Sequence, residues 1–374
     1  MLPDIDNFIS FSNMDESAVI NNNYSPPFIK RLKEKLFRWM RLTTRPTVRV
    51  YHGYGANGQL VVFGHVLKVS PLPRKTFRNN VFTNTFALIR LFIVKPIPHA
   101  RVTLQFNGEA IHHTAEKDGF FRFQWSPQVM PAPGWHRLEV YIDEGVVKQY
   151  YGIVKGAGEL YVPYVRQYAV ISDIDDTFLI SHSSNLRKRL FVLLTQNAYS
   201  RQPFEGVVKH YRALAFAGTV QQEPNPFFFV SSSEWNLYDY IRNFAAKNEL
   251  PKGIYLLAQM KRLSQAWKTG QNKHATKFFR ITRIMEAFPE QGFILLGDDS
   301  QQDPVIYASV VEHFPRQIKA VYLRNIYHKN EQEVRRSIER IKASGVAVCH
   351  FRHSSEAFDH SLRLGLFADV RRET

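Results

Sequence analysis

The stretch Tyr168-Ala169-Val170-Ile171-Ser172-Asp173-Ile174-Asp175-Asp176-Thr177 joins an apolar run to a cluster of acids. The run at 168–171 predicts a buried strand. Because side chains at i and i+2 of an extended segment face the same side, Asp173 and Asp175 are expected to converge just beyond the end of that strand, where open parallel sheets bind ligands. Two like charges so close need a cation or a proton between them. The stretch therefore predicts a metal-assisted site for phosphoryl chemistry.

Magnesium suits such a site, because it is a hard cation that takes oxygen ligands and keeps waters and phosphate oxygens in its shell. A carboxylate can attack phosphorus and form an aspartyl-phosphate. Asp175 is then the candidate that protonates the leaving alkoxide and activates water. The structural alternatives for 173–177 are an Asp-rich turn and a helix cap. A calcium EF-hand is excluded, because Phe178 and Ser184 stand where its pattern requires Gly and Glu.

A second predicted strand, at 226–230, ends in Ser231-Ser232-Ser233 and is followed by a helical stretch at 234–248. Hydroxyl groups at a strand end and a helix N-terminus form a phosphate-binding site. The structural alternative is helix capping, which Ser233 would provide in either case.

Two later segments add a cation and further acids. Lys277 lies at the start of an amphipathic helix, where its charge would neutralise a phosphorylated intermediate; the alternative is a solvated surface lysine. Residues 292–296 predict a third strand, which leads into Gly297-Asp298-Asp299-Ser300 and Asp303. These carboxylates at a strand end are suited to completing a metal site.

Strand-Asp-x-Asp-x-Thr, strand-Ser, helix-Lys and strand-Gly-Asp-Asp, in this order, resemble the four motifs of the haloacid dehalogenase phosphatase superfamily. The resemblance implies a Rossmann-like α/β domain with a parallel sheet, Mg²⁺ as cofactor, Asp173 as nucleophile and Asp175 as general acid and base. The implied site consists of Asp173, Asp175 and Lys277 for catalysis, Thr177, Ser231 and Ser232 for substrate binding, and Asp173, Asp175, Asp298, Asp299 and Asp303 for the metal.

Within that superfamily the segments Val230–Tyr238, Leu250–Gly253 and Gly297–Tyr307 resemble a phosphatidate phosphatase catalytic-domain family, first described in a fungal actin-patch protein and common in bacteria. The resemblance covers roughly 163–351 and implies a lipid phosphate as substrate. The chain departs from that family at Glu234, where Pro usually precedes the Trp, and at Gly297-Asp298-Asp299-Ser300, where the family usually has Gly-Asp-Ser-Gly. The additional Asp299 leaves open which acid binds the metal.

Composition narrows the class of protein. At 374 residues the chain is long enough for two domains, and 44% hydrophobic residues support sizeable cores. The net charge of +16 predicts an anionic partner: phosphate, a lipid headgroup or nucleic acid. Nucleic acid is the less favoured of these, because no zinc-finger or RNA-stacking motif occurs. The single Cys349 excludes an intramolecular disulfide framework and lies in an apolar run that predicts burial.

The sequence predicts a cytoplasmic protein that is peripheral at a membrane. No secretory signal is recognised, and no apolar run approaches the roughly 20 residues that span a bilayer. Residues 1–27 are expected to be loosely ordered. Residues 28–43 predict a basic amphipathic helix of the kind that lies in anionic membranes. The alternative is a helix that packs on its own protein and leaves its basic face in solvent.

Two folded domains are expected to follow. Short strand-like runs with turn signals predict an antiparallel β-sandwich at 45–155, an accessory module in which His112-His113 reads as an incidental pair in a turn. Alternating strands and helices predict the haloacid dehalogenase-like phosphatase domain at 160–350. Within it, 178–225 is too long for a simple crossover and is expected to form a flap and small cap. Residues 351–374 form a basic tail.

Three functions remain after these observations. The first is a Mg²⁺-dependent phosphatase that converts phosphatidate to diacylglycerol at a membrane surface. The second keeps the same site but acts on a soluble phosphomonoester. The third is a catalytically silent adaptor that binds membranes, which the presence of all four motifs disfavours.

Overall fold

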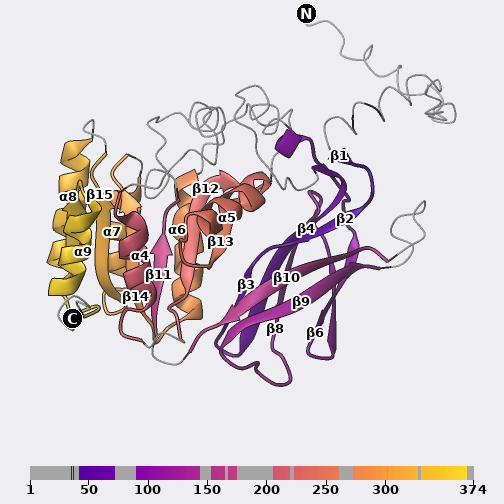
Figure 1. Ribbon diagram of the computed structural model, residues 1–374, viewed down its shortest axis with the longest axis horizontal. Helices are drawn as coiled ribbons and strands as arrows, with labels where there is room; N and C mark the ends of the chain where they lie inside the picture. The colour runs from indigo at the N-terminus through magenta and orange to yellow at the C-terminus, as the bar shows by residue number, and fades with distance from the viewer. Residues whose placement is uncertain are drawn as a thin grey trace, which may run out of the picture. The chain divides into compact units, whose positions relative to one another are not determined.

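The computed structural model describes residues 42–71, 90–143, 153–164, 167–174, 205–219, 223–260, 273–300, 302–326 and 330–368, together with Lys35 and Phe37 (Figure 1). The chain divides into two compact units, Met1–Arg41 and Leu42–Thr374, and the second is described here. The predicted basic helix at 28–43 lies mostly outside the described residues. Its last two residues differ from the prediction, because Leu42 and Thr43 pair with a later strand.

The C-terminal half contains a six-stranded sheet in which every neighbouring pair is parallel. The strand order is β13-β12-β11-β14-β15-β16. Most of these strands are continuous apolar runs, as expected where helices cover a parallel sheet. The predicted parallel sheet is therefore confirmed. Its strands are β11 (Tyr168–Ser172), β12 (Phe227–Glu234), β13 (Gly253–Ala258), β14 (Gly292–Asp298), β15 (Ile318–Arg324) and β16 (Ala347–Phe351).

Helices connect these strands (Figure 1). Helices α6, α7 and α8 lie side by side, and α4 contacts α9. Since parallel crossovers are right-handed, the connections that run from β11 towards β13 and those that run from β13 back to β16 lie on opposite faces. The helices are α4 (Val207–Ala215), α5 (Tyr238–Lys247), α6 (Lys273–Ala287), α7 (Asp303–His313), α8 (Glu331–Ala343) and α9 (Ser354–Arg363), with a short 3-10 helix η2 (Trp235–Leu237) before α5.

The strand order reverses at β11. The chain passes from β11 to β12 and β13 on one side and then returns to β14 on the other. Such a reversal leaves a crevice at the carboxyl ends of the central strands, which is where ligands bind in open α/β sheets. At the far edge of the sheet, β16 has one strand neighbour, and Cys349 on it is only half-buried rather than buried as predicted.

The N-terminal part forms a ten-stranded, mainly antiparallel sheet around the long strand β4. One pair, β3 and β10, is parallel. The main path is β1-β4-β3-β10-β9-β6-β7, and β2, β5 and β8 also pair with β4. The strands are β1 (Leu42–Thr43), β2 (Thr47–Val50), β3 (Gly53–Ala56), β4 (Gln59–Pro71), β5 (Lys95–Pro96), β6 (Arg101–Phe106), β7 (Glu109–Thr114), β8 (Phe120–Trp125), β9 (Gly134–Ile142) and β10 (Lys155–Val162), with a 3-10 helix η1 (Arg90–Phe92).

Asn107 and Gly108 form the tight turn between β6 and β7. Asn107 and Gly108 have φ of 49° and 83°, the left-handed conformations of a type I′ turn. The predicted placement of His112 and His113 in a turn was wrong, because both lie in β7. Because successive strand residues point to opposite faces, these two side chains do not form a common ligand pair, and His112 instead contacts the Thr103 hydroxyl at 2.8 Å.

Candidate active site

The first and last acidic motifs meet at the centre of the parallel sheet. Asp173 follows β11, and Asp298 ends β14. These strands are neighbours, with Ser172 opposite Leu296, and the Asp173 N–H donates to the Leu296 carbonyl at 2.8 Å. Asp303 begins α7, one short loop after Asp298. The parallel pairing of β11 and β14 therefore brings together acids that are more than 120 residues apart in the sequence.

These three carboxylates form a buried group. Asp173, Asp298 and Asp303 are at most 1% exposed, and one oxygen from each lies within 4.8 Å of the others. The Asp303 Oδ2 atom is buried and, among the described residues, has no hydrogen-bond partner. Buried carboxylates of like charge need a compensating cation. An all-oxygen donor set with an unused buried oxygen fits a hard divalent metal.

Lys277 reaches this group from the first turns of α6. Its Nζ donates to Asp173 Oδ1 at 2.7 Å and also to Asp303 Oδ1. Burial alone would lower the pKa of Lys277, but the carboxylates of Asp173 and Asp303 outweigh it and raise the pKa above its ordinary value. The lysine therefore stays charged at neutral pH, 4% exposed, between two acids.

Asp299 has a different position from Asp298. One Asp299 oxygen accepts the Ile326 N–H at 2.7 Å, and the other lies 3.0 Å from His350 Nε2. These contacts tie the end of β14 to the ends of β15 and β16. The structure thus brings Asp298, and not Asp299, together with Asp173 and Asp303. Asp298 Oδ1 in turn accepts the Ser300 N–H at 2.6 Å, which fixes the loop before α7.

The three serines form an irregular stretch of β12. In the pairing of β12 with β13, Val230 lies opposite Leu256 and Glu234 lies opposite Ala258. The three serines of β12 between these pairs therefore face a shorter stretch of β13. Such a bulge redirects side chains and is common beside active sites. The Ser231 hydroxyl accepts the Ser233 N–H at 2.9 Å. Ser231 and Ser233 are buried, and Ser232 is half-exposed.

Arg280 joins the serine stretch to the helix that carries Lys277. Its Nη1 donates to the Ser231 carbonyl at 2.8 Å. Burial lowers the pKa of Arg280 to about 10, which still leaves it charged at neutral pH. Reading the sequence missed Arg280, His350 and Gly297 as residues that shape the site. The signal for Arg280 was its place one helical turn after Lys277, which puts both on one face of α6.

Other predicted residues lie outside the described part of the chain. Asp175 and Thr177 are among them, as are Asp176 and most of the predicted cap at 178–225. From that stretch the structure describes α4 and its surroundings. The roles of Asp175 and Thr177 therefore stay predictions.

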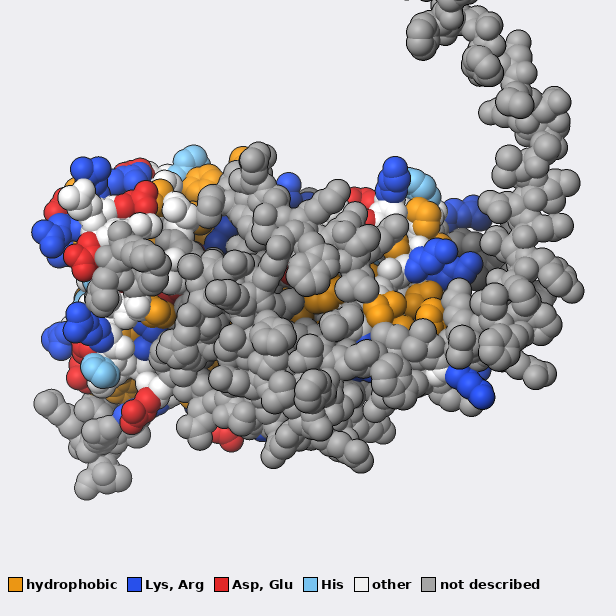
Figure 2. Space-filling view, turned by 90° about the horizontal axis from the view of Figure 1, so that it is seen from above, with side chains coloured by type: hydrophobic (Ala, Val, Ile, Leu, Met, Phe, Trp, Pro, Cys, Tyr) orange, Lys and Arg blue, Asp and Glu red, His pale blue; other side chains and the backbone are white. Residues whose placement is uncertain are grey.

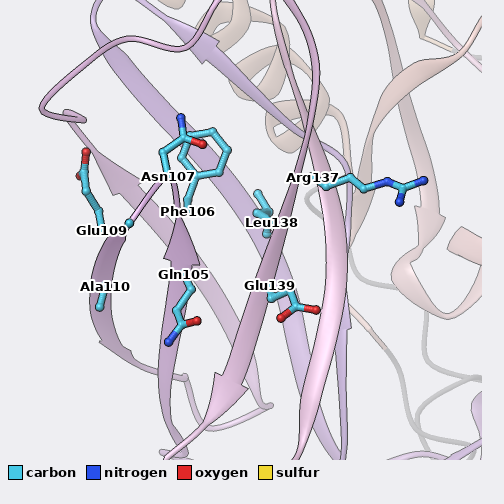
Figure 3. Close-up of a pocket in the computed structure, with 9 residues that line it drawn as sticks. Gln105, Phe106, Asn107, Glu109, Ala110, Arg137, Leu138 and Glu139 are labelled. Atoms are coloured by element: carbon cyan, nitrogen blue, oxygen red, sulfur yellow. The ribbon is translucent and has the colours of Figure 1, made fainter.

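A hollow of about 550 Å³ lies on the N-terminal sheet beside the β6–β7 hairpin (Figure 3). Its lining includes Glu109, Arg137 and Glu139. Figure 3 shows that the Arg137 side chain points away from Glu109 on the opposite side of the hollow. Glu139 is already paired with Lys155 at 2.8 Å. Charged groups do not converge there, so we assign it no site.

The surface around α8 and α9 carries both signs of charge. Figure 2 shows Lys and Arg side chains interspersed with Asp and Glu at that end of the molecule. One such pair is Arg340 with Glu312, at 2.7 Å. Among the described residues at this end of the molecule, Lys and Arg therefore do not form a continuous basic surface. Among the described residues, no helix is long and apolar enough to cross a membrane.

Residues 168–325 match the family model described as the catalytic domain of phosphatidate phosphatase APP1. The chain is 28% identical over 163 residues to phosphatidate phosphatase APP1 of Saccharomyces cerevisiae, which covers 43% of this chain and 27% of that protein. It is 24% identical over 160 residues to an uncharacterised protein of Schizosaccharomyces pombe, covering 42% and 25%. The chain thus spans about a quarter of the length of these relatives.

Among solved structures, a carbohydrate acetylesterase from Xanthomonas citri is 11% identical and has a TM-score of 0.33, covering 86% of this chain and 74% of its own. This likeness is too distant to support an inference.

Proposed function

We propose that this chain, whose residues 168–325 match the family model of the phosphatidate phosphatase APP1 catalytic domain, hydrolyses phosphatidate to diacylglycerol and phosphate. The observation that carries the proposal is the buried group of Asp173, Asp298, Asp303 and Lys277 at the carboxyl ends of β11 and β14. A buried cation held between acids at that point of an α/β sheet suits phosphoryl transfer, which depends on positioning and on charge stabilisation.

In the proposed reaction, a carboxylate oxygen of Asp173 attacks phosphorus and the bond from phosphorus to the lipid alkoxide breaks. Asp175 donates a proton to the leaving alkoxide, which becomes the hydroxyl of diacylglycerol. Asp175 then takes a proton from water as that water attacks the aspartyl-phosphate. Inorganic phosphate leaves, and Asp173 is regenerated. Lys277 stabilises the negative charge that gathers around phosphorus, and Ser231 and Ser232 bind the phosphoryl oxygens.

Asp173, Asp298 and Asp303 would hold the metal, and we propose Mg²⁺ because the donors are all carboxylate oxygens. When bound, Mg²⁺ would neutralise phosphate charge and orient the phosphoryl group. Asp299 is proposed as a structural support for Asp298, since its oxygens hold Ile326 and His350.

We also propose that the parallel-sheet part is a Rossmann-like haloacid dehalogenase domain at about 160–350. Support comes from the order of motifs along the chain and from the reversal of strand order at β11. The antiparallel part is proposed to be a β-sandwich at about 45–155, and the basic helix at 28–43 is proposed to bring the enzyme to anionic lipid at a cytoplasmic membrane surface.

The substrate is tested by comparing phosphate release from phosphatidate in vesicles with release from soluble monophosphates, namely a nucleotide, a sugar phosphate and glycerol phosphate. We expect kcat/KM for phosphatidate to exceed that for each soluble substrate by at least about 10-fold, because binding energy from the lipid contributes to the transition state. Equal turnover of a soluble monophosphate would assign the same site to a soluble substrate. Vesicle binding with no turnover of any substrate would indicate an adaptor.

A further inference from the structure

The downstream end of the serine stretch is held by the N-terminal sheet. Both sheets lie in the unit Leu42–Thr374 and contribute to one hydrophobic core cluster. Residues Ser231–Ser233 run directly into Glu234 and η2, and η2 packs against the loop between β2 and β3. The phosphate-binding segment is thus flanked on one side by the parallel sheet and on the other by the β2–β3 loop, which contacts Tyr238 from 186 residues earlier in the chain.

An aromatic stack forms the centre of this contact. The rings of Tyr51 and Trp235 lie 4.2 Å apart at an angle of 12°, a stacked arrangement. Tyr51 also contacts Tyr238, with ring centroids 4.5 Å apart. Tyr51 is 1% exposed and Trp235 is 4% exposed. Trp235, two residues beyond Ser233, therefore packs directly on the ring of Tyr51.

Hydrogen bonds surround the stack. The His52 N–H donates to the Tyr238 hydroxyl at 2.9 Å, and the His52 ring donates from Nδ1 to the Gly253 carbonyl at 2.7 Å. The Asn236 side chain donates from Nδ2 to the Leu91 carbonyl at 2.9 Å. Asn236 of η2 and Tyr238, the first residue of α5, are thus tied by hydrogen bonds to Leu91 in η1 and to His52 in the loop between β2 and β3.

The burial of the segment Trp235–Tyr238 argues against a direct contact of this segment with the substrate. A conspicuous aromatic and amide segment beside a phosphate loop is a natural candidate for substrate contact. Each of its residues is at most 4% exposed, and three of them contact the N-terminal sheet through the interactions above. The segment is therefore buried against its own chain and is not exposed for contact with a substrate.

We propose that the N-terminal sheet positions the serine stretch for catalysis and that Tyr51 is its central positioning residue. The N-terminal sheet is then part of the active enzyme, and an isolated domain starting near Tyr168 would have a misplaced phosphate-binding segment. Displacement of a phosphate-binding group by about 1 Å lowers activity by about 100-fold. The proposal rests on the proposed phosphatase function and adds a role for a part of the chain outside the matched family segment.

The test compares Tyr51→Leu, which removes the stacked ring, with Tyr51→Phe, which keeps the ring and removes only the hydroxyl that contacts His65. Phe123→Leu is the control, because Phe123 is equally buried but belongs to the separate core cluster of the N-terminal sheet. All variants are full-length and are assayed well below their unfolding midpoints. The readouts are kcat/KM, inhibition by inorganic phosphate, and hydrogen–deuterium exchange of residues 227–237.

We expect Tyr51→Leu to lower kcat/KM by at least about 10-fold, to weaken inhibition by phosphate and to speed exchange at 227–237, because the serines lose their fixed position. We expect kcat/KM of Tyr51→Phe to stay within about 3-fold of the wild-type value, because the ring contact with Trp235 remains. Phe123→Leu lowers the unfolding midpoint but leaves kcat/KM and the exchange of 227–237 unchanged.

The proposal is overturned if Tyr51→Leu keeps wild-type kcat/KM, or if it loses no more activity than Phe123→Leu at matched stability. The exchange measurement separates this result from failure of the proposed function. If wild type hydrolyses no phosphomonoester, faster exchange at 227–237 in Tyr51→Leu alone still supports the positioning role, and unchanged exchange refutes it.

Discussion

Gly297 illustrates how closely the last motif is packed. A Cβ atom at Gly297 would lie 2.6 Å from Asp303 Oδ2 and 2.8 Å from Tyr307 Cε2. The glycine is therefore required by the approach of the Asp303 carboxylate, not by a turn. Reading the sequence identified the acids of this motif but not this requirement, because the contact depends on the fold of the loop from Asp298 to α7.

Gly297→Ala is expected to lower kcat/KM by about 100-fold, because the added methyl group displaces Asp303 from Asp173 and Lys277. Gly292→Ala in the same strand is the matched control. Its Cβ would lie 2.6 Å from Lys319 Cε, 3.0 Å from Lys319 Cγ and 3.1 Å from Tyr168 Cδ1. The Lys319 side chain is exposed and can move away, and no carboxylate of the buried group is among these contacts. Steady-state assays of both variants make the comparison, and equal effects would mean that β14 responds to any added methyl group.

The two adjacent acids of β14 are expected to differ in importance. Asp298→Ala is predicted to lower kcat/KM by at least about 100-fold and to abolish Mg²⁺ binding, because it removes one carboxylate of the buried group. Asp299→Asn is predicted to stay within about 10-fold of wild type, since the amide oxygen still accepts the Ile326 N–H. Calorimetric titration with Mg²⁺ and steady-state assays check both. The reverse order of effects would make Asp299 the metal ligand.

At the scale of elements, the apolar runs were sufficient to predict the central strands. A continuous apolar run of strand length bounded by polar residues indicates a strand buried on both faces, and 168–171, 226–230 and 292–296 all proved to be strands. Strands β7 and β10 were not predicted, because β7 is mostly exposed, the burial along β10 is irregular, and β10 pairs in part with the distant strand β3. The bulge at Ser231–Ser233 likewise arises from pairing with β13 and leaves no local signal.

The hydrogen bond from Arg280 on α6 to the Ser231 carbonyl on β12 gives a prediction about these two elements. Arg280→Met is expected to lower kcat/KM by about 10- to 100-fold, because loss of a charged hydrogen bond, worth about 1.5–3 kcal/mol, loosens the Ser231 backbone. Arg280→Lys, which keeps a donor, is expected to recover part of that loss. Arg283→Met is the control, since Arg283 is exposed on the same helix. A full loss of activity in Arg283→Met as well would show that α6 is simply destabilised.

At the scale of the whole molecule, the largest gap in the sequence-based account is the contact between the two sheets. The sequence predicted an accessory module before a catalytic domain and gave no indication of their contact. The bond from His52 to Tyr238 joins residues 186 positions apart, and the one to Gly253 joins residues 201 apart. Neither propensity nor periodicity carries information over such separations, so the stacking of Tyr51 on Trp235 could be found only in three dimensions.

Buried histidines predict how the stability of the whole chain depends on pH. Burial lowers the pKa of His52 to about 4 and that of His210 to about 3, and it also lowers the pKa of His65. Glu159 opposes this shift at His52, while Arg242 and Lys252 reinforce it. Each histidine is neutral in the folded state down to its lowered pKa, whereas in the unfolded chain it binds a proton below about 6.5. The stability that these neutral histidines contribute is therefore fully present above about pH 6.5 and is lost as the pH falls towards their lowered pKa values.

The expected loss is about 2 kcal/mol per buried histidine between pH 7 and pH 5. Urea unfolding at the two pH values measures it. His52→Gln retains a donor for the Gly253 carbonyl and removes one titrating group, so its stability is expected to depend less steeply on pH. A chain that is as stable at pH 5 as at pH 7 would contradict the burial of these rings as neutral groups.

The central claim is that Asp173 is the nucleophile of a phosphatase, and phosphate release from phosphatidate vesicles in the presence of Mg²⁺ tests it most directly. Wild type is compared with Asp173→Asn and with the control Asp359→Asn on α9, away from the buried group. We predict that Asp173→Asn lowers kcat at least about 1,000-fold while the unfolding transition stays cooperative, because an amide cannot form the aspartyl-phosphate. Asp359→Asn should match wild type. Phosphatase activity retained in folded Asp173→Asn would contradict the account.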